Sequence, residues 1–385
     1  MDIKSLARDV QDQVIAFRRD LHMHPEASFQ EFRTTDQIAK ALDEMGIPYR
    51  RFEPTGLIGE IKGGKPGKTV ALRADIDALS ITEKTGLEFA SQNEGFMHAC
   101  GHDTHAAMLM GAAMVLNSVK DELCGTVKLL FQPAEEVAGG AKKVIAQGAL
   151  EGVDYIFGIH IAAMMPVGAV GMRYGASAAS ADIFRIKVTG RAAHGAMPQT
   201  GCDATVAAAA IVMNLQTIVS RENAPEKPLV VTVGKLESGS RFNIVSGEAN
   251  MEGTIRCYDY DLHHSLPAMV KRVAENTAEA FRCKAEVDYE MMTEVLINDA
   301  KSVDLARGAA AKIVEDPALL IEVPATMGGE DFAEYTPLCK ASFAMVGAGG
   351  EYPQHSDHVV FDENSFRTGV ALYAQVAVDF LNSQD

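Results

Sequence analysis

The sequence predicts an α/β protein in which a larger domain is interrupted by a smaller α+β domain. Three observations predict this organisation. Apolar runs alternate with helical stretches up to about residue 180, the order of elements then changes, and the alternation of strand and helix returns after residue 300. Alternating strands and helices are typical of a layered α/β domain with a mixed or parallel sheet. At 385 residues, the chain is long enough for two or three domains of roughly 100 to 200 residues each.

The larger domain is expected to begin with helices. Apolar residues recur at helical spacing between Val10 and Leu21, and again between Ile38 and Met45. The pattern then changes to short apolar runs bounded by turn residues, which are typical of buried strands. These runs lie at 69–72, 126–131 and 155–159, and helical stretches fall between them near 103–119 and 140–147.

A different order of elements begins at about residue 181. It runs strand (183–189), helix (204–219), two strands (229–236 and 249–258), helix (262–281) and strand (284–289). This βαββαβ order is the ferredoxin-like split motif. After residue 300 a helix, an apolar strand (342–346) and a C-terminal helix from about residue 363 follow. We therefore assign 1–180 and 295–385 to the larger domain and 181–294 to an inserted α+β domain.

Composition excludes several classes of partner. The chain has 35 basic and 52 acidic side chains, a net charge of −17, and such an acidic surface repels nucleic acid and anionic lipid head groups. The first thirty residues contain no signal-peptide apolar block, and no stretch approaches the roughly 18 apolar residues of a membrane span. The six cysteines show no CxxC spacing. We expect a reduced cytoplasmic protein with neither nucleic acid nor a membrane as partner.

The densest cluster of chemically active side chains is MHACGHDTHAAMLMGAA, at 97–113. Cys100 and His102 lie where a loop enters a helix, and a helix N-terminus favours a thiolate over a thiol. Taken alone, Cys-x-His is more often a buried thiol beside a capping histidine. The metal-ligand interpretation therefore depends on the segments that follow.

Two adjacent carboxylates follow an apolar strand in LLFQPAEEVAGGA. Paired glutamates are usually a solvated turn, but Glu135 and Glu136 come at a strand end, where α/β sheets place their ligand sites. One carboxylate can bind a metal while its uncoordinated neighbour takes a proton from water.

Histidines supply the remaining candidate ligands. DYIFGIH is a predicted strand ending in His160, and YPQHSDH offers His355 or His358, with spacing to the following residues favouring His355. Four separate elements thus end in cysteine, histidine or glutamate. This mixed set suits zinc or, less selectively, manganese, cobalt or nickel. Its members are Cys100, His102, Glu136, His160 and His355.

These residues lie in segments through which the chain resembles the M20 metallopeptidase clan, specifically its aminoacylase-like amidohydrolases such as hippurate and auxin-conjugate hydrolases. The segments include DLHMHPEASFQEF, ALRADIDAL, HACGHDTHAAMLMGAA, FQPAEE, GIH, RAAHGAMPQTGCDA, RFNIVSGEANMEGTIR and GGEDFAEY, in family order from about residue 14 to 370. The combination of HACGHDTH with FQPAEE is highly specific.

The resemblance implies two divalent metal ions in the larger domain, with the five residues above as ligands and Glu135 as general base. The bridging ligand stays open, although a Cys100 thiolate can span two ions. Three aspartates are expected to orient the ligands: Asp75, Asp77 and Asp103.

The inserted domain resembles the family's lid and dimerisation domain, which implies a homodimer. His194 would reach the partner's site and polarise the scissile carbonyl. Asn243 and Arg256 would bind substrate, and Arg256 suits its free α-carboxylate. Gly328 and Gly329 would bring backbone close to the substrate.

We therefore predict a metal-dependent amidohydrolase that cleaves N-acyl amino acids, small molecules with an amide between an acyl group and an amino acid. A dipeptidase or carboxypeptidase of the same clan is the alternative within this class. A metal-binding homologue without turnover is a further alternative, against which the retained Glu135 argues. The last alternative is a redox role for Cys100.

Overall fold

The computed structural model of the chain describes residues 1–383, which form two compact units. Unit 1 comprises Met1–Gly175, Ile297–Pro324 and the chain from Asp331 onward, whereas unit 2 comprises Ala176–Leu296 and Ala325–Glu330. Each unit has its own hydrophobic core. Unit 2 begins five residues before the predicted insertion at 181, ends two residues after 294, and includes a second short segment that no periodicity marks.

Unit 1 is built on an eight-stranded sheet of order β1-β2-β4-β3-β5-β16-β6-β15. Its strands are β1 (Tyr49–Arg51), β2 (Leu57–Lys62), β3 (Lys65–Asp75), β4 (Cys124–Gln132), β5 (Tyr155–Ala162), β6 (Val170–Met172), β15 (Leu320–Glu322) and β16 (Lys340–Gly347). β3 is parallel to both β4 and β5, and β5 is parallel to β16. β2 is antiparallel to β4, which makes the sheet mixed, as predicted. The four parallel strands therefore all end at the same edge of the sheet.

Seven helices of unit 1 pack around this sheet or against one another. They are α1 (Ile3–Asp9), α2 (Gln11–Met23), α3 (Phe32–Glu44), α4 (His102–Ser118), α5 (Gly140–Ala146), α8 (Ala300–Ile313) and α9 (Phe366–Asn382). α4 is buried along almost its whole length, between β3, α2 and α9. The predicted N-terminal helical stretch is broken before α3, because Pro25 disfavours helix at His24 and Phe29 has a φ of 62°.

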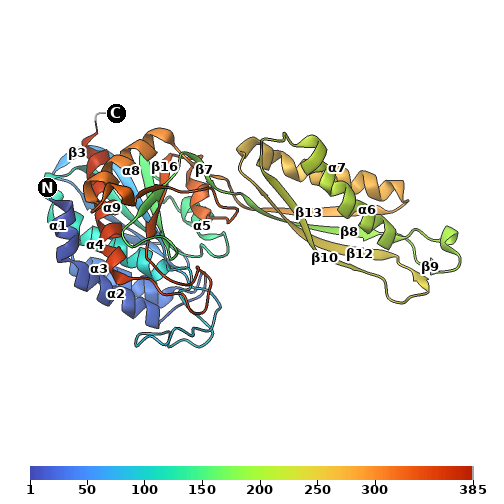
Figure 1. Cartoon of the computed structure of the whole chain (residues 1–385), viewed down its shortest axis with the longest axis horizontal. Coiled ribbons are helices and arrows are strands. Elements are labelled where there is room, and N and C mark those ends of the chain that lie inside the picture. Colours follow the sequence, from blue (N-terminus) through green and yellow to red (C-terminus); the bar gives the residue numbers. More distant parts are fainter. Residues whose placement is uncertain (384–385) are drawn as a thin grey trace. The chain divides into compact units, whose positions relative to one another are not determined.

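Unit 2 contains a four-stranded antiparallel sheet of order β10-β12-β8-β13. Its strands are β8 (Ala181–Thr189), β10 (Leu229–Ser238), β12 (Glu248–Cys257) and β13 (Lys284–Thr293), and its helices are α6 (Ala204–Thr217) and α7 (Tyr260–Ala280). Four short strands complete the chain: β7 (Gly175–Ala178), β9 (Ala193–His194), β11 (Ile244–Val245) and β14 (Leu296–Asn298). α6 and α7 lie on one face of the sheet (Figure 1), which explains the alternating burial along β8.

The segment Ala204–Glu222, comprising α6 and a following π turn, is long and apolar enough to cross a membrane by length and composition alone. Ile211 and Leu215 of this segment are fully buried in the unit 2 core. Only 33% of its most apolar window is buried, so one face of the helix packs on the core and the other is accessible.

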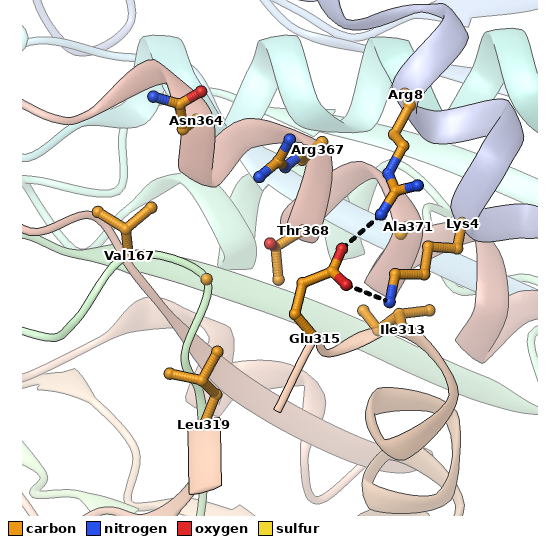
Figure 2. A pocket seen from close by; sticks show the side chains of 11 residues that line it. Lys4, Arg8, Val167, Ile313, Glu315, Leu319, Asn364, Arg367, Thr368 and Ala371 are labelled. Carbon is orange, nitrogen blue, oxygen red and sulfur yellow. Dashed lines mark hydrogen bonds and ion pairs between the residues drawn. The ribbon is translucent and has the colours of Figure 1, made fainter. Parts of the chain in front are cut away.

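An exposed ion cluster connects the N-terminal helix to the end of α8 in unit 1. Glu315 lies 3.0 Å from Lys4 Nζ and 2.5 Å from Arg8 Nη2, beside a small pocket that Arg367 also lines (Figure 2). Exposed ion pairs of this kind each contribute little stability.

A buried ion cluster joins α2 to α4. Asp103 Oδ2 lies 2.8 Å from Arg18 Nε and 2.7 Å from His22 Nδ1, and all three side chains are buried. Burial alone would raise the pKa of Asp103, but Arg18 and His22 hold it well below its usual value. Asp103 was predicted to orient metal ligands; it instead binds these two residues, because successive helical positions such as His102 and Asp103 point about 100° apart.

The Asp103→Asn variant should lower the free energy of unfolding by about 3–5 kcal/mol at neutral pH, because the charge of Arg18 is left buried without its carboxylate. Since the folded-state pKa of Asp103 is depressed, its contribution is present above the ordinary aspartate pKa and is lost as the pH falls. Urea titrations should therefore show the difference from wild type shrinking below about pH 4. Asp12→Asn, at an exposed position of α2, is the control. Equal stabilities of Asp103→Asn and wild type would contradict this account.

Candidate metal centre

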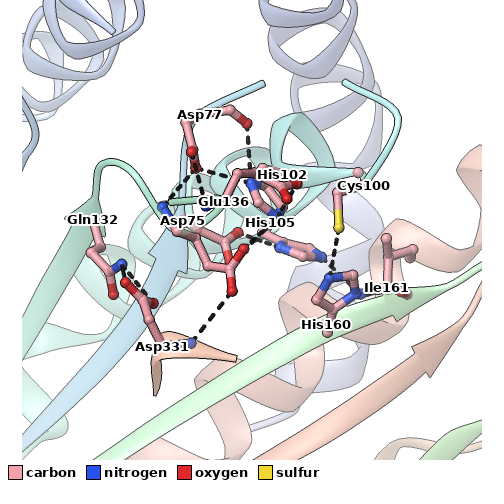
Figure 3. A network of polar contacts seen from close by, with 12 residues as sticks. Asp75, Asp77, Cys100, His102, His105, Gln132, Glu136, His160, Ile161 and Asp331 are labelled. Atoms are coloured by element: carbon pink, nitrogen blue, oxygen red, sulfur yellow. Dashed lines mark hydrogen bonds and ion pairs between the residues drawn. The ribbon is translucent and has the colours of Figure 1, made fainter. Parts of the chain in front are cut away.

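The predicted metal ligands of the larger domain meet at the edge where the parallel strands of unit 1 end (Figure 3). Asp75 ends β3, Glu135 and Glu136 follow β4, and His160 lies in the last part of β5. His102 is the first residue of α4. Parallel α/β sheets bind ligands at this edge because successive strands deliver their following loops to the same place.

The hydrogen bonds of two histidines indicate which ring nitrogen of each is available to a metal. His102 Nδ1 lies 3.0 Å from the backbone oxygen of Asp77, and His160 Nδ1 lies 2.6 Å from that of Ile161. Both Nδ1 atoms must carry hydrogen to donate to carbonyl oxygens, so in the neutral ring each Nε2 presents a lone pair. Within residues 1–383, His102 Nε2 is buried without a hydrogen-bond partner, and His160 Nε2 faces Cys100 Sγ at 3.3 Å.

Cys100 belongs to two clusters of candidate ligands. Its sulfur and the ligand atoms of His102 and His160 all lie within 4.8 Å of one another, and so do those of Cys100, Glu136 and His355. The two clusters share only this sulfur. A thiolate, imidazoles and a carboxylate are suitable donors for zinc-type ions. The residues therefore fit two adjacent divalent ions, which would also satisfy the unpartnered His102 Nε2 and the buried Glu136 Oε1.

The electrostatics of the cluster indicate what a cation would change. Burial raises the pKa of the Cys100 thiol well above its ordinary value, so the helix N-terminus alone does not stabilise a thiolate there. Burial likewise raises the pKa of Glu136, and burial with the nearby His105 lowers that of His160. Neutral imidazole and thiolate are the forms that bind metal, and the thiolate form of Cys100 needs a cation beside it.

The loop glycine before α4 brings the chain close enough to build this centre. Gly101 has a φ of 95°, and an added Cβ would lie 2.4 Å from Ile161 Cγ2 and 2.9 Å from Phe361 Cζ. A larger residue would therefore displace either α4 or the end of β5.

Asp77 connects His102 to both glutamates. Its Oδ1 accepts the backbone N–H of Glu135 at 3.0 Å and lies 3.2 Å from His102 Nδ1, while its Oδ2 accepts the N–H of Glu136 at 3.1 Å and the hydroxyl of Ser28 at 2.6 Å. Burial alone would raise the pKa of Asp77, but the contacts with His102 hold it below its usual value. The ionised carboxylate thus fixes one ligand ring and the turn that carries Glu135 and Glu136.

The Asp77→Asn variant should bind metal 10–100-fold more weakly, because an amide can accept only one of the two backbone N–H groups at its oxygen and repels the other at its nitrogen. Competition with a chromophoric chelator measures this affinity. Asp43→Asn, in the exposed part of α3, should leave it unchanged. An unaltered affinity in Asp77→Asn would show that the carboxylate does not orient the ligands.

Two residues that the sequence analysis missed support the centre. His105 Nδ1 lies 2.5 Å from Asp75 Oδ1, and its Nε2 accepts the N–H of Ile161 at 2.7 Å, next to His160. His105 could have been found from the sequence, because residues three positions apart on a helix, such as His102 and His105, lie on the same face. Glu31 accepts the N–H of Ala134 at 2.8 Å, fixing the turn before the paired glutamates. Burial raises the pKa of Glu31 to about 7.

The two C-terminal histidine candidates take different positions. His355 Nε2 lies 3.9 Å from Glu136 Oε2, although the His355 side chain is 56% exposed. His358 Nδ1 instead lies 2.6 Å from Asp357, and its ring packs against Tyr352. The geometry therefore favours His355 as the ligand.

The remaining predicted site residues lie in unit 2. His194 is exposed in β9, and its Nδ1 accepts the N–H of Ala196 at 3.1 Å, which leaves its Nε2–H available as a donor. Arg256 is half-buried in β12, and within the described chain its Nη1 is buried without a hydrogen-bond partner. The Asn243 carbonyl accepts the N–H of Gly195 at 2.8 Å.

Gly328 and Gly329 lie in the short second segment of unit 2. A Cβ added at Gly329 would lie 3.1 Å from both Ala181 Cβ and Thr293 Oγ1, so close packing within unit 2 restricts this position.

Comparison with known proteins identifies similar chains. The profile of peptidase family M20/M25/M40 matches residues 71–379. An N-acetyl-L-cysteine deacetylase of Bacillus subtilis is 42% identical over 98% of this chain and 90% of its own length. Thermostable carboxypeptidase 1 of Saccharolobus solfataricus is 35% identical over 99% of this chain and 98% of its own length. A Bacillus subtilis dinuclear metal-binding peptidase of the M20 family, of known structure, is 37% identical with a TM-score of 0.85, covering 97% of this chain and 99% of its own.

Proposed function

Because this chain belongs to peptidase family M20/M25/M40, we propose that it hydrolyses the amide bond of N-acyl amino acids with two divalent metal ions. The metal ligands in this proposal are Cys100, His102, Glu136, His160 and His355. The solved relative binds two metals, and the deacetylase relative acts on an N-acyl amino acid. The chain is thus a metal-dependent amide hydrolase, and its acyl and amino-acid preferences are what the experiments below address.

One observation carries the proposal: two adjacent carboxylates on a single turn have different surroundings. Both face His102 Nε2, Glu136 Oε1 at 3.8 Å and Glu135 Oε2 at 4.0 Å. Glu136 also groups with Cys100 and His355, with its Oε2 3.9 Å from His355 Nε2, whereas Glu135 Oε1 lies 3.4 Å from the backbone nitrogen of Asp331. These contacts support Glu136 as a ligand and Glu135 as the group that transfers a proton next to the ligands.

The chain's own residues then divide the work of amide hydrolysis. Two bound divalent ions would supply Lewis-acid polarisation and a water of lowered pKa. Glu135 accepts the proton of the attacking water at a carboxylate oxygen and donates it to the nitrogen of the leaving amine. The Nε2–H of His194 is suited to donate to the oxygen of the scissile carbonyl as negative charge develops there. Asp77 keeps the Glu135 backbone in place throughout.

Arg256 is proposed to bind the free α-carboxylate of the substrate, because its buried Nη1 has no hydrogen-bond partner within residues 1–383 and a guanidinium pairs well with a carboxylate. Arg256→Ala should lower kcat/KM for N-acetyl amino acids about 10–100-fold, the effect of losing a charged hydrogen bond. The same variant should leave hydrolysis of the matching N-acetyl amino acid amides nearly unchanged, since these lack the carboxylate. Equal losses for both substrates would contradict this role.

The carboxypeptidase relative favours one alternative, an enzyme that removes C-terminal amino acids from peptides. Free-amine release from N-acetyl, N-benzoyl and N-indolylacetyl amino acids and from unblocked dipeptides, with manganese or zinc under reducing conditions, separates the two. Preferential cleavage of blocked substrates supports the proposed function, whereas preferential cleavage of dipeptides supports the alternative. Metal-loaded protein that cleaves none of them would contradict both.

A homodimer formed through unit 2 is part of the proposal. Unit 2 carries large apolar side chains with high exposure, including Phe242 at 95% and Met213 at 69%. Mixing His194→Ala with Glu135→Gln protein tests whether sites are shared between subunits. Activity that returns in the mixture, when neither variant alone is active, supports sharing. No recovery in verified heterodimers would exclude it.

A further inference from the structure

A second cluster of potential ligands lies in unit 2, entirely on residues that the proposed reaction does not use. His263 and His264 are the fourth and fifth residues of α7, and Glu294 directly follows β13. One ligand atom from each of the three residues lies within 4.8 Å of the other two. We propose that His263, His264 and Glu294 form a binding site for a divalent transition-metal ion of the zinc type.

Asp182 prepares His263 for this role. The Asp182 side chain is fully buried in β8, with Oδ1 2.8 Å from His263 Nε2 and Oδ2 2.6 Å from the hydroxyl of Tyr289. A carboxylate only accepts hydrogen bonds, so His263 Nε2 donates to Asp182, and Nδ1, which lies 3.1 Å from Glu294 Oε2, is the atom that would lose its hydrogen to bind a metal. A carboxylate behind a histidine in this way orients metal-binding histidines and increases their basicity.

One oxygen of Glu294 lies at ligand spacing from both histidines. Glu294 Oε2 is 3.1 Å from His263 Nδ1 and 3.2 Å from His264 Nε2. Ligand atoms about 2.0–2.1 Å from a tetrahedral zinc ion are separated by roughly 3.3 Å. His263 uses its near ring nitrogen and His264 its far one, which is how two successive helical residues can reach one point. Little movement is needed for the three atoms to enclose an ion.

The exposure of the cluster leaves room for a fourth ligand. His263 is buried and the Glu294 side chain is 16% exposed, whereas the His264 side chain is 42% exposed. The His264 ring packs on Tyr260, with 4.4 Å between ring centroids, which restricts its orientation. Two imidazoles and a carboxylate with one position open to water are a donor set that suits zinc, cobalt or nickel and is poor for magnesium or calcium.

The test is the number of zinc ions bound per chain by the full-length protein. Wild type, His264→Ala, Glu294→Gln and Tyr260→Leu are dialysed against micromolar zinc chloride, and bound metal is measured by mass spectrometry of the elements. We expect His264→Ala and Glu294→Gln each to bind one zinc ion fewer than wild type. Tyr260→Leu removes the ring that restricts His264 but no ligand atom, so it should bind as many ions as wild type, although less tightly.

The difference in zinc content between wild type and each variant does not depend on how many ions the candidate metal centre holds. The unit 2 metal site and the proposed amide hydrolysis can therefore each be refuted without the other. His264→Ala should hydrolyse amides at the wild-type rate, which confirms that its missing ion comes from unit 2. Equal zinc contents in wild type, His264→Ala and Glu294→Gln would overturn the proposal and leave His263 as part of an ion pair network only.

Discussion

Glu135→Gln protein should bind two metal ions per chain as wild type does, while its kcat falls about 10²–10⁴-fold, the usual contribution of a general base. Glutamine keeps the size of the side chain but has no basic oxygen pair to hold the transferred proton. The turn should survive, because Asp77 holds it through the backbone N–H groups of Glu135 and Glu136. Single-turnover kinetics with elemental analysis of the same sample measure both quantities.

The neighbouring residue provides a matched control. Glu136→Gln makes the same chemical change one position along the chain, at a side chain whose oxygens face His102 and His355. It should lose bound metal and activity together, and excess metal should partly restore the rate. Full activity in Glu135→Gln, or metal loss in that variant instead of in Glu136→Gln, would reverse the assigned roles.

The second large effect is expected for Cys100→Ala, which should lose affinity for both metal ions. Cys100 Sγ is the atom shared by the two clusters of candidate ligands, and the thiol is only 8% exposed. The affinity loss should exceed the 10–100-fold effect of changing an outer partner such as Asp77. Isothermal titration with zinc or manganese measures it, and hydrolysis at stoichiometric metal should fall with it.

Cys202→Ala is the matched control for this variant, since Cys202 is a buried thiol in unit 2. It should bind metal as wild type does. The redox interpretation of Cys100 makes a different prediction: a redox thiol reacts readily with disulfide reagents whether or not metal is present. A coordinated Cys100 should instead be protected until a chelator is added. Unchanged metal binding in Cys100→Ala would contradict its place in the centre.

The sequence was sufficient for the family, the α/β class and the mixed sheet, all of which are confirmed. Long apolar runs identify the buried strands, and side chains that follow them must gather at one edge of a parallel sheet. Three-residue strands such as β1, β6 and β15 carry no usable periodicity. The boundary before α3 was missed because helical spacing was found only at 10–21 and 38–45, which does not show where one helix ends and the next begins.

Predicting the candidate centre from the sequence had a different limit. Motifs indicated which residues could bind metal, but not which neighbours would hold them. The backbone N–H groups that bind Asp77, and the carboxylate of Glu31 behind Ala134, involve contacts between residues 58 or more positions apart. Asp103 stands next to His102 in the sequence and yet binds Arg18, because adjacent helical residues face different elements. The joint action of His194 and Arg256 with the metal ligands stays a prediction.

Anomalous diffraction from crystals of zinc-loaded protein, recorded at the zinc absorption edge, tests the central claim most directly. The account predicts two neighbouring peaks in unit 1, both about 2.3 Å from Cys100 Sγ, with His102, His160, Glu136 and His355 completing their coordination. Glu135 should lie beside the pair without binding either ion. A single peak in this region, or two peaks of which neither contacts Cys100, would contradict the account.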